Sequence, residues 1–254
     1  MRVRQPAVAG RFYTGDSYEL AEEVAGYLAA VPHGGPQPPG IIVPHAGHIF
    51  SGPVAAHAYA TLRSTPRVVL AGPAHFVPVD GIAATSADVW RTPLGDVEID
   101  QDAVTSAGLV RDDHPHAPEH SLEVQLPFLQ VQLEPGWRLL PLLVGRADPA
   151  TVADVLEGFL ADPNTTVVLS TDLSHYLTYD QARARDEATA QRIVAKDWRH
   201  IDDHDACGAY PLRGLLLAAD RLDMPVRLLD LRNSGDTAGP HDRVVGYGAF
   251  AVGL

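Results

Sequence analysis

The chain has 254 residues, 46% hydrophobic and 20% charged, and is long enough to bury a sizeable core. Its formal net charge of -13 disfavours a nucleic-acid binder or a binder of anionic membranes, because both need a basic surface. No apolar run approaches the roughly 18 residues that span a bilayer, and a single cysteine excludes an internal disulfide bond. We therefore expect a cytoplasmic protein with one domain over residues 1–254.

The first half of the chain alternates helical and strand patterns. Leu20, Val24 and Leu28 recur at helical spacing after Asp16, which predicts a capped helix over residues 16–31. A loop rich in proline and glycine leads to a strand over 40–45, a helix over 51–64 and a strand over 67–75. The pattern then predicts β structure over 81–100 and a helix over 119–133.

The second half continues the alternation. It predicts strands over 137–145 and 165–175, with a helix over 148–161 between them. Helices over 178–197 and 209–222 follow, and the chain ends in strands over 226–233 and 243–254. Apolar strands that alternate with helices indicate an α/β fold, with a mixed, largely parallel sheet flanked by helices.

Three separate apolar strands lead into histidine. The strand IIVPH ends at His45, VVLAGPAH ends at His75, and VVLSTDLSH carries Asp172 and His175. In α/β sheets, ligands bind beyond the carboxyl ends of the strands. A single histidine after a strand is more often a loop residue, but three such ends favour one shared site.

Two further groups are candidates for this site. Cys207 precedes a predicted helix, whose N-terminus would lower the thiol pKa and favour a thiolate that ligates a metal or acts as a nucleophile. Free cysteine is also common as a small buried hydrophobe. In EHSLE, His120 and Glu123 are three residues apart at the start of a predicted helix, so we expect them to share a face. They would supply acid/base groups or cap the helix.

Two histidines and one anionic ligand leave open positions on a metal ion. With a carboxylate as the third ligand, this set suggests non-haem Fe(II), whereas a thiolate also suits Zn(II) or copper. The sequence has no compact pair of ligands such as HxxxH or CxxC around these positions. The residues alone therefore leave the third ligand open among Cys207, Asp172 and Glu123.

Six motifs, in order along nearly the whole chain, resemble the Memo family, whose prokaryotic members are called AmmeMemoRadiSam system protein B. They are PHAGHIFSGPVAAHAY, GPAHFVP, RTPLGDVEID, EHSLEVQLPFL, LSTDLSHY and ACGAYPLRGLL. The resemblance implies a fold similar to class III extradiol dioxygenases, which are non-haem Fe(II) enzymes that open catechol rings. It implies that the metal ligands are His45, His75 and Cys207. It implies that other polar residues line the same pocket: Asp172, His175 and His120.

The main hypothesis is a mononuclear metal-binding protein with a redox or oxygenase-like role on a small-molecule substrate. We expect Fe2+, with copper or zinc as alternatives. His120 and His175 would transfer protons, and Asp172 would orient a neighbouring imidazole. The dioxygenases use a carboxylate where this chain has Cys207, which argues against ring cleavage. The resemblance also implies a functional link to an AMMECR-type domain and a radical-SAM protein.

Two alternatives from other classes stay open. The chain would be a peptide- or protein-binding module if the pocket binds a partner but supports no turnover. It would be a metal-free Cys-His hydrolase if Cys207 is a nucleophile, although one histidine base would then suffice.

Overall fold

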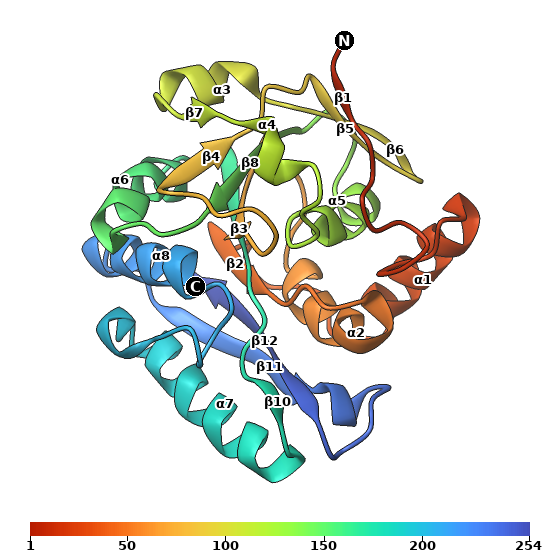
Figure 1. Ribbon diagram of the computed structural model, residues 1–254, viewed down its shortest axis with the longest axis vertical. Coiled ribbons are helices and arrows are strands. Elements are labelled where there is room, and N and C mark those ends of the chain that lie inside the picture. The colour runs from red at the N-terminus through yellow and green to blue at the C-terminus, as the bar shows by residue number, and fades with distance from the viewer.

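The computed structural model describes residues 1–254 and contains one large sheet with helices on both faces (Figure 1). The centre of this sheet consists of four parallel strands, in the order β2 (Gly40–Val43), β9 (Thr165–Ser170), β3 (Arg67–Pro73) and β8 (Arg138–Val144). Because these strands are parallel, their carboxyl ends lie along one edge of the sheet.

Antiparallel strands extend both sides of this parallel centre. Next to β2 lies β12 (Val244–Val252), which also pairs with β11 (Val226–Asn233) and β10 (His175–Leu177). Next to β8 lies β4 (Ile82–Ala84), which pairs with β7 (Val110–Arg111). A separate sheet has the order β1 (Val3–Arg4), β5 (Val89–Thr92) and β6 (Gly95–Glu98). The predicted mixed α/β sheet is confirmed, with parallel pairing concentrated in its centre.

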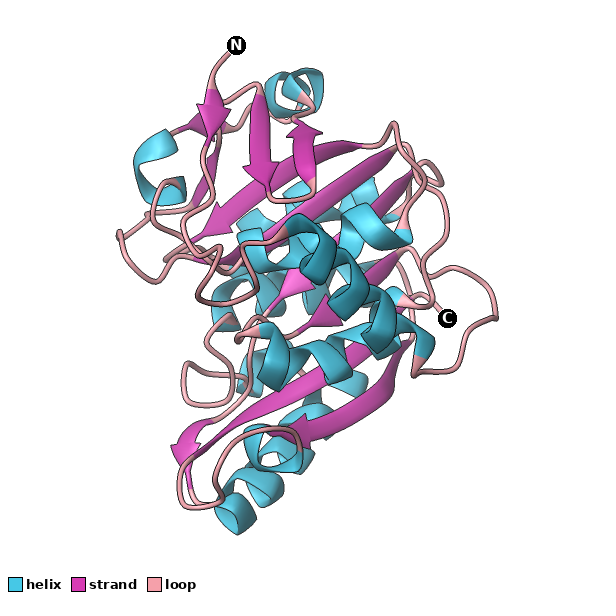
Figure 2. Cartoon of the chain, turned by 90° about the vertical axis from the view of Figure 1, so that its right-hand side faces the viewer, coloured by secondary structure: helices cyan, strands magenta, loops and turns pink.

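The helices cover the two faces of the large sheet as separate layers (Figures 1 and 2). One layer contains α1 (Ser17–Ala29), α2 (His48–Tyr59) and α5 (Leu126–Gln132). The other contains α6 (Pro149–Leu160), α7 (Tyr179–Val194) and α8 (Ala209–Arg221). Successive strand residues point to opposite faces, so Ile41 packs in the first core and Ile42 in the second.

The remaining helices are short: α3 (Gln101–Ser106), α4 (Asp113–His116) and 3-10 turns at Glu123–Gln125, Trp198–His200 and Ser234–Asp236. None of the helices combines the length and the apolar character that crossing a bilayer requires.

Two predicted elements are shorter than the sequence pattern indicated. The helix expected over 119–133 is a 3-10 turn at Glu123–Gln125 followed by α5, which has Pro127 in its first turn. Proline has no backbone N–H to donate and therefore favours the first turn of a helix. The strand expected over 165–175 ends at Ser170. Both differences leave irregular chain near the predicted site, in the segments that carry His120 and Asp172.

Candidate metal centre

The loops after three neighbouring strands form the base of the site. His45 is the second residue after β2, His75 is the second after β3, and Asp172 is the second after β9. Since β9 lies between β2 and β3, these three positions are brought together at the carboxyl edge of the sheet. The structure therefore brings the ends of these three strands together, as the sequence predicts.

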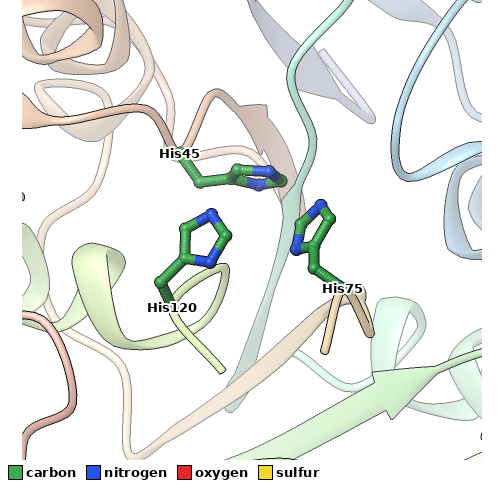
Figure 3. Close-up of side chains that lie close together, drawn as sticks. All are labelled: His45, His75 and His120. Carbon is green, nitrogen blue, oxygen red and sulfur yellow. The ribbon is translucent and has the colours of Figure 1, made fainter. Parts of the chain in front are cut away.

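Three imidazole rings face one another at this edge (Figure 3). One ring nitrogen from each of His45, His75 and His120 lies within 4.8 Å of the other two. The ring centroid of His45 is 5.1 Å from that of His75 and 5.5 Å from that of His120. His120 comes from the loop before the 3-10 turn. The three histidines form a candidate metal site, which includes a residue that the sequence pointed to as a proton-transfer group.

The hydrogen bonds of Ser170 fix the tautomer of His45. The Ser170 hydroxyl donates to the backbone carbonyl of Ser121 at 2.6 Å, which uses its only hydrogen. The Nδ1 atom of His45 lies 2.9 Å from the same hydroxyl oxygen, so Nδ1–H must be the donor. Gln125 also donates to this oxygen, at 2.8 Å. The Nε2 atom of His45 is therefore the acceptor nitrogen of the ring, and its lone pair points toward the site.

Glu119 fixes the orientation of His75. The Nδ1 atom of His75 lies 2.9 Å from Oε1 of Glu119, and the backbone N–H of His75 donates to Oε2 at 2.6 Å. Burial opposes ionisation of Glu119, but hydrogen bonds from His75 and from Ser121 outweigh it and lower the pKa of the carboxyl to about 2. An ionised carboxylate can only accept, so Nδ1 of His75 donates and Nε2 is the ring nitrogen that remains for a metal ion.

His120 lies against the same carboxylate but is held less firmly. Its Nδ1 atom is 3.2 Å from Oε1 of Glu119, yet the contact is not aligned as a hydrogen bond and this buried atom has no other partner. Burial lowers the pKa of His120 to about 4. Burial, followed by the neighbouring histidines, lowers the pKa of His45 well below its usual value. Both rings are therefore neutral at pH 7, as metal ligands must be.

Cys207 lies beside the three histidines, with its Sγ atom 3.2 Å from Nε2 of His45. The backbone N–H of Asp172 donates to this sulfur at 3.3 Å. Burial raises the pKa of the thiol, and the carboxylate of Asp172 raises it further. The expectation that the helix N-terminus would favour a thiolate was wrong, because burial and Asp172 outweigh it. The S–H group therefore donates to His45, and the ligand role of Cys207 stays a prediction.

Asp172 and His175 are held by main-chain contacts. Asp172 accepts the backbone N–H of His45 at 2.6 Å, while its second oxygen is 4.0 Å from the Nε2 atom of that ring. It thus positions the main chain of His45 more directly than the ring. Burial raises the pKa of Asp172. The Nδ1 atom of His175 donates to the carbonyl of Leu173 at 2.8 Å. The proton-transfer role of His175 stays a prediction.

Glu123 binds residues near the N-terminus and does not share a helix face with His120. Its carboxylate is fully buried and contacts Arg4 at 2.5 Å, the Tyr13 hydroxyl at 2.7 Å and two backbone N–H groups near the N-terminus. His120 instead faces the histidine cluster. The prediction that His120 and Glu123 share a helix face was wrong, because His120 precedes the helical turn. Glu123 is therefore not a candidate for the third ligand.

A cavity of about 750 Å³ opens above these residues. Of the seven residues that the sequence singled out, all but Glu123 line it: His45, His75, His120, Asp172, His175 and Cys207. Aromatic side chains, including Phe12 and Phe50, form part of its wall. The cavity has the volume of a small-molecule site, which is typically about 300–1,000 Å³.

Sequence reasoning missed Glu119 and Ser170, which orient the two predicted histidine ligands. Glu119 directly precedes His120, and a carboxylate next to a candidate histidine was a usable signal. Ser170 is the last residue of an apolar strand and pairs with a histidine 125 positions away in the chain. Nothing in the local pattern indicates that contact.

Comparisons with known proteins agree with the family that the motifs indicate. The family model described as Memo-like protein matches residues 4–251. A MEMO1 family protein of Methanopyrus kandleri is 38% identical, over 97% of this chain and 98% of its own length. One from Aquifex aeolicus is 34% identical, over 97% and 98%.

A solved structure shares the fold. The crystal structure of an uncharacterized protein from Escherichia coli K12 superposes with a TM-score of 0.50 and 14% sequence identity, covering 82% of this chain and 98% of that one. At that identity the likeness concerns the fold alone. The family model and the relatives establish the assignment: this chain belongs to the Memo family.

Proposed function

We propose that the chain is a mononuclear metalloprotein that acts on a small organic molecule in a redox or oxygenase-like reaction. The observation that carries this proposal is that Ser170 and Glu119 hold the Nδ1 atoms of His45 and His75, which leaves both Nε2 atoms for one shared site. Two imidazoles beside a thiol are a donor set that suits iron, copper or zinc.

His45, His75 and Cys207 would hold the metal, as the family resemblance implies. The Sγ atom of Cys207 already lies at 3.2 Å from Nε2 of His45, and loss of its proton would supply the anionic ligand. His120 is the competing third donor, because it lies in the same cluster. We propose Fe2+ as the metal, with copper or zinc as alternatives. When bound, such an ion supplies Lewis acidity and, for iron or copper, redox chemistry.

The chain's own residues would bind the substrate and transfer protons. His120 is neutral at pH 7 and faces the cavity, so its ring can accept a proton from a bound molecule. His175 donates its Nδ1–H to a backbone carbonyl, which in the neutral ring leaves Nε2 as the proton acceptor. Asp172 holds the main chain of His45 in place and thereby fixes the first ligand.

Metal analysis of protein purified without oxygen tests this proposal. We expect about one metal ion per chain in the wild type, with the spectroscopic signature of any iron or copper, and loss of metal in His45→Ala and His75→Ala. His57→Ala is the matched control. His57 is a partly buried histidine 3.5 Å from Asp230, and it does not line the cavity. Full metal occupancy in both site variants, or equal loss in all three, would overturn the proposal.

A metal-free Cys-His hydrolase is the second candidate. The Sγ to Nε2 distance of 3.2 Å is that of a nucleophile and its base, and Ser170 orients the histidine from its other side. The raised pKa of the buried thiol works against this chemistry. Iodoacetamide labelling separates the two functions, because a ligand is protected by metal and exposed by chelator. A nucleophile outside any metal site is labelled equally in both states.

Two wider expectations remain part of the proposal. The functional link to an AMMECR-type domain and a radical-SAM protein is supported by family membership, and co-purification of the three proteins tests it. A cytoplasmic location is supported by the single cysteine, which forms no disulfide bond.

A further inference from the structure

The rim of the metal-site cavity carries one cationic side chain. Arg243 is the sole lysine or arginine among the residues that line this cavity. Its guanidinium lies 4.4 Å from the ring centroid of Tyr176. No carboxylate oxygen approaches the guanidinium within 4.0 Å, whereas nine other arginines of the chain form such ion pairs. The charge of Arg243 is thus available to a molecule inside the cavity.

The backbone around Tyr176 is arranged to place its ring at this rim. In β10, His175 pairs with Val245 and Leu177 with Val244, so Tyr176 is an extra residue between them and forms a bulge. Its φ of 61° lies in the left-handed region, which is uncommon for a bulky residue. Bulges redirect side chains, often next to functional sites. Here the bulge leaves the Tyr176 side chain 63% exposed and stacked against Arg243, which directly precedes β12.

The rest of the cavity is suited to an organic body rather than to a free inorganic ion. Its volume of about 750 Å³ falls in the range typical of small-molecule sites. Phe12, Phe50 and Tyr247 are among the aromatic residues that line the cavity. The histidine cluster lines the same cavity, and Arg243 lies at its rim.

A cation at this position favours an anionic ligand, because the chain as a whole is acidic and repels anions. The chain carries a formal net charge of -13. Asp172 lies in the cavity floor, and Asp203 also lines the cavity. Guanidinium groups bind carboxylates and phosphates through two parallel hydrogen bonds, and a stacked guanidinium is already partly ordered. Arg243 is therefore the group that would attract and orient an acid.

We propose that Arg243 and Tyr176 form an anion subsite, which binds the acid group of an aromatic or otherwise planar organic acid. The acid group is a carboxylate or a phosphate monoester, and the planar body lies against the aromatic wall of the cavity. The anion subsite requires no metal. Only the orientation of the other end of the ligand toward the histidines rests on the proposed metal site.

Ligand-observed fluorine NMR on chelator-treated protein tests the subsite directly. The probes are 4-fluorobenzoate, 4-fluorophenyl phosphate and the neutral 4-fluorobenzamide. We expect at least one anionic probe to bind the wild type about tenfold or more tightly than the amide, since hydrogen bonds to charged groups contribute on this scale. The anion that binds more tightly identifies the acid group.

Variants of two arginines test whether the anionic probe binds at Arg243. Arg243→Gln should weaken the anionic probe about tenfold or more and leave the amide unchanged, while Arg243→Lys should retain part of the affinity. Arg199→Gln is the matched control. Arg199 also stacks on an aromatic ring, Trp198 at 4.2 Å, but it lies in a different cavity. We expect no change in that variant.

Two outcomes overturn the inference. One is equal binding of the anionic and neutral probes to the wild type. The other is an equal effect of the Arg243 and Arg199 variants, which would indicate adventitious binding to surface arginines. Metal content is measured separately on untreated protein. If the untreated wild type contains no metal while the chelator-treated protein binds the anion through Arg243, the proposed metal function is wrong and this subsite stands.

Discussion

Glu119 accepts two hydrogen bonds from one residue, His75: its Oε1 atom lies 2.9 Å from the ring Nδ1 and its Oε2 atom lies 2.6 Å from the backbone nitrogen. This pairing holds both the ring and the main chain of a proposed ligand. The same Oε1 atom also accepts the backbone N–H of His120 at 2.9 Å. One buried carboxylate thus positions two of the three histidines of the cluster.

Glu119→Gln should therefore weaken metal binding by about 10–100-fold, the usual effect of losing such a supporting carboxylate. The amide still fits the space but cannot accept from both nitrogens of His75. Competition against a chromophoric chelator measures the affinity, and circular dichroism checks the fold. Glu134→Gln, at an exposed position, is the control and should bind metal as the wild type does. Unchanged affinity in Glu119→Gln would show that this carboxylate does not support the site.

Arg4→Met should destabilise the fold by about 3–5 kcal/mol, because it leaves the buried carboxylate of Glu123 without its cationic partner. Metal affinity should fall less than in Glu119→Gln, because Arg4 contacts only the backbone carbonyl of Glu119, at 2.6 Å, and neither Arg4 nor Glu123 lines the cavity. Urea unfolding measures the free energy. Arg91→Met breaks an exposed pair with Asp96 and should have little effect. A similar, small effect of both changes would mean that the buried pair does not hold the N-terminal segment.

Asp186 should make stability depend on pH. Burial raises the pKa of its carboxyl to about 6, above the value of about 3.9 expected for the unfolded chain. The folded state thus binds more protons between these values, and this residue's contribution to stability is lost as the pH rises from about 4 through about 6.

Asp186→Asn should remove that dependence. Asparagine is neutral at every pH and its side-chain oxygen can still accept the backbone N–H of Ser174, which Asp186 accepts at 3.0 Å. The variant should gain stability relative to the wild type between pH 4 and pH 7, by at most about 3 kcal/mol. Urea midpoints at both pH values measure the difference. Gln191→Asn, at an exposed and non-titrating position of the same helix, is the control and should show a constant difference. A constant difference for Asp186→Asn would contradict the prediction.

The strand ends were predictable, whereas the side-chain partners were not. His45, His75 and Asp172 follow apolar strands, and the parallel sheet brings their positions together as the pattern indicates. The tautomer of His45 depends on Ser170 and on a carbonyl at Ser121, which lie far apart in the chain. Contacts of this kind arise from tertiary packing, and no local periodicity encodes them.

Two expectations near the site failed, each for its own reason. His120 and Glu123 were expected on one helix face, but the helix begins later, with Pro127 in its first turn, and the two side chains diverge. The Cys207 thiol was expected to be activated by its helix, but burial and Asp172 raise its pKa instead. The first failure follows from where the helix starts, whereas in the second the tertiary surroundings outweigh the local signal.

The identity of the third ligand is the central claim, and proton release during metal binding tests it most directly. The thiol of Cys207 is protonated in the metal-free protein, so coordination must release its proton. In a weakly buffered titration at pH 7, the wild type should release about one proton more per metal ion than Cys207→Ser. The Cys207→Ser variant should also bind the metal more weakly. His120→Ala should keep its metal. Equal proton release and equal affinity in Cys207→Ser, together with loss of metal in His120→Ala, would contradict the account and make His120 the third ligand.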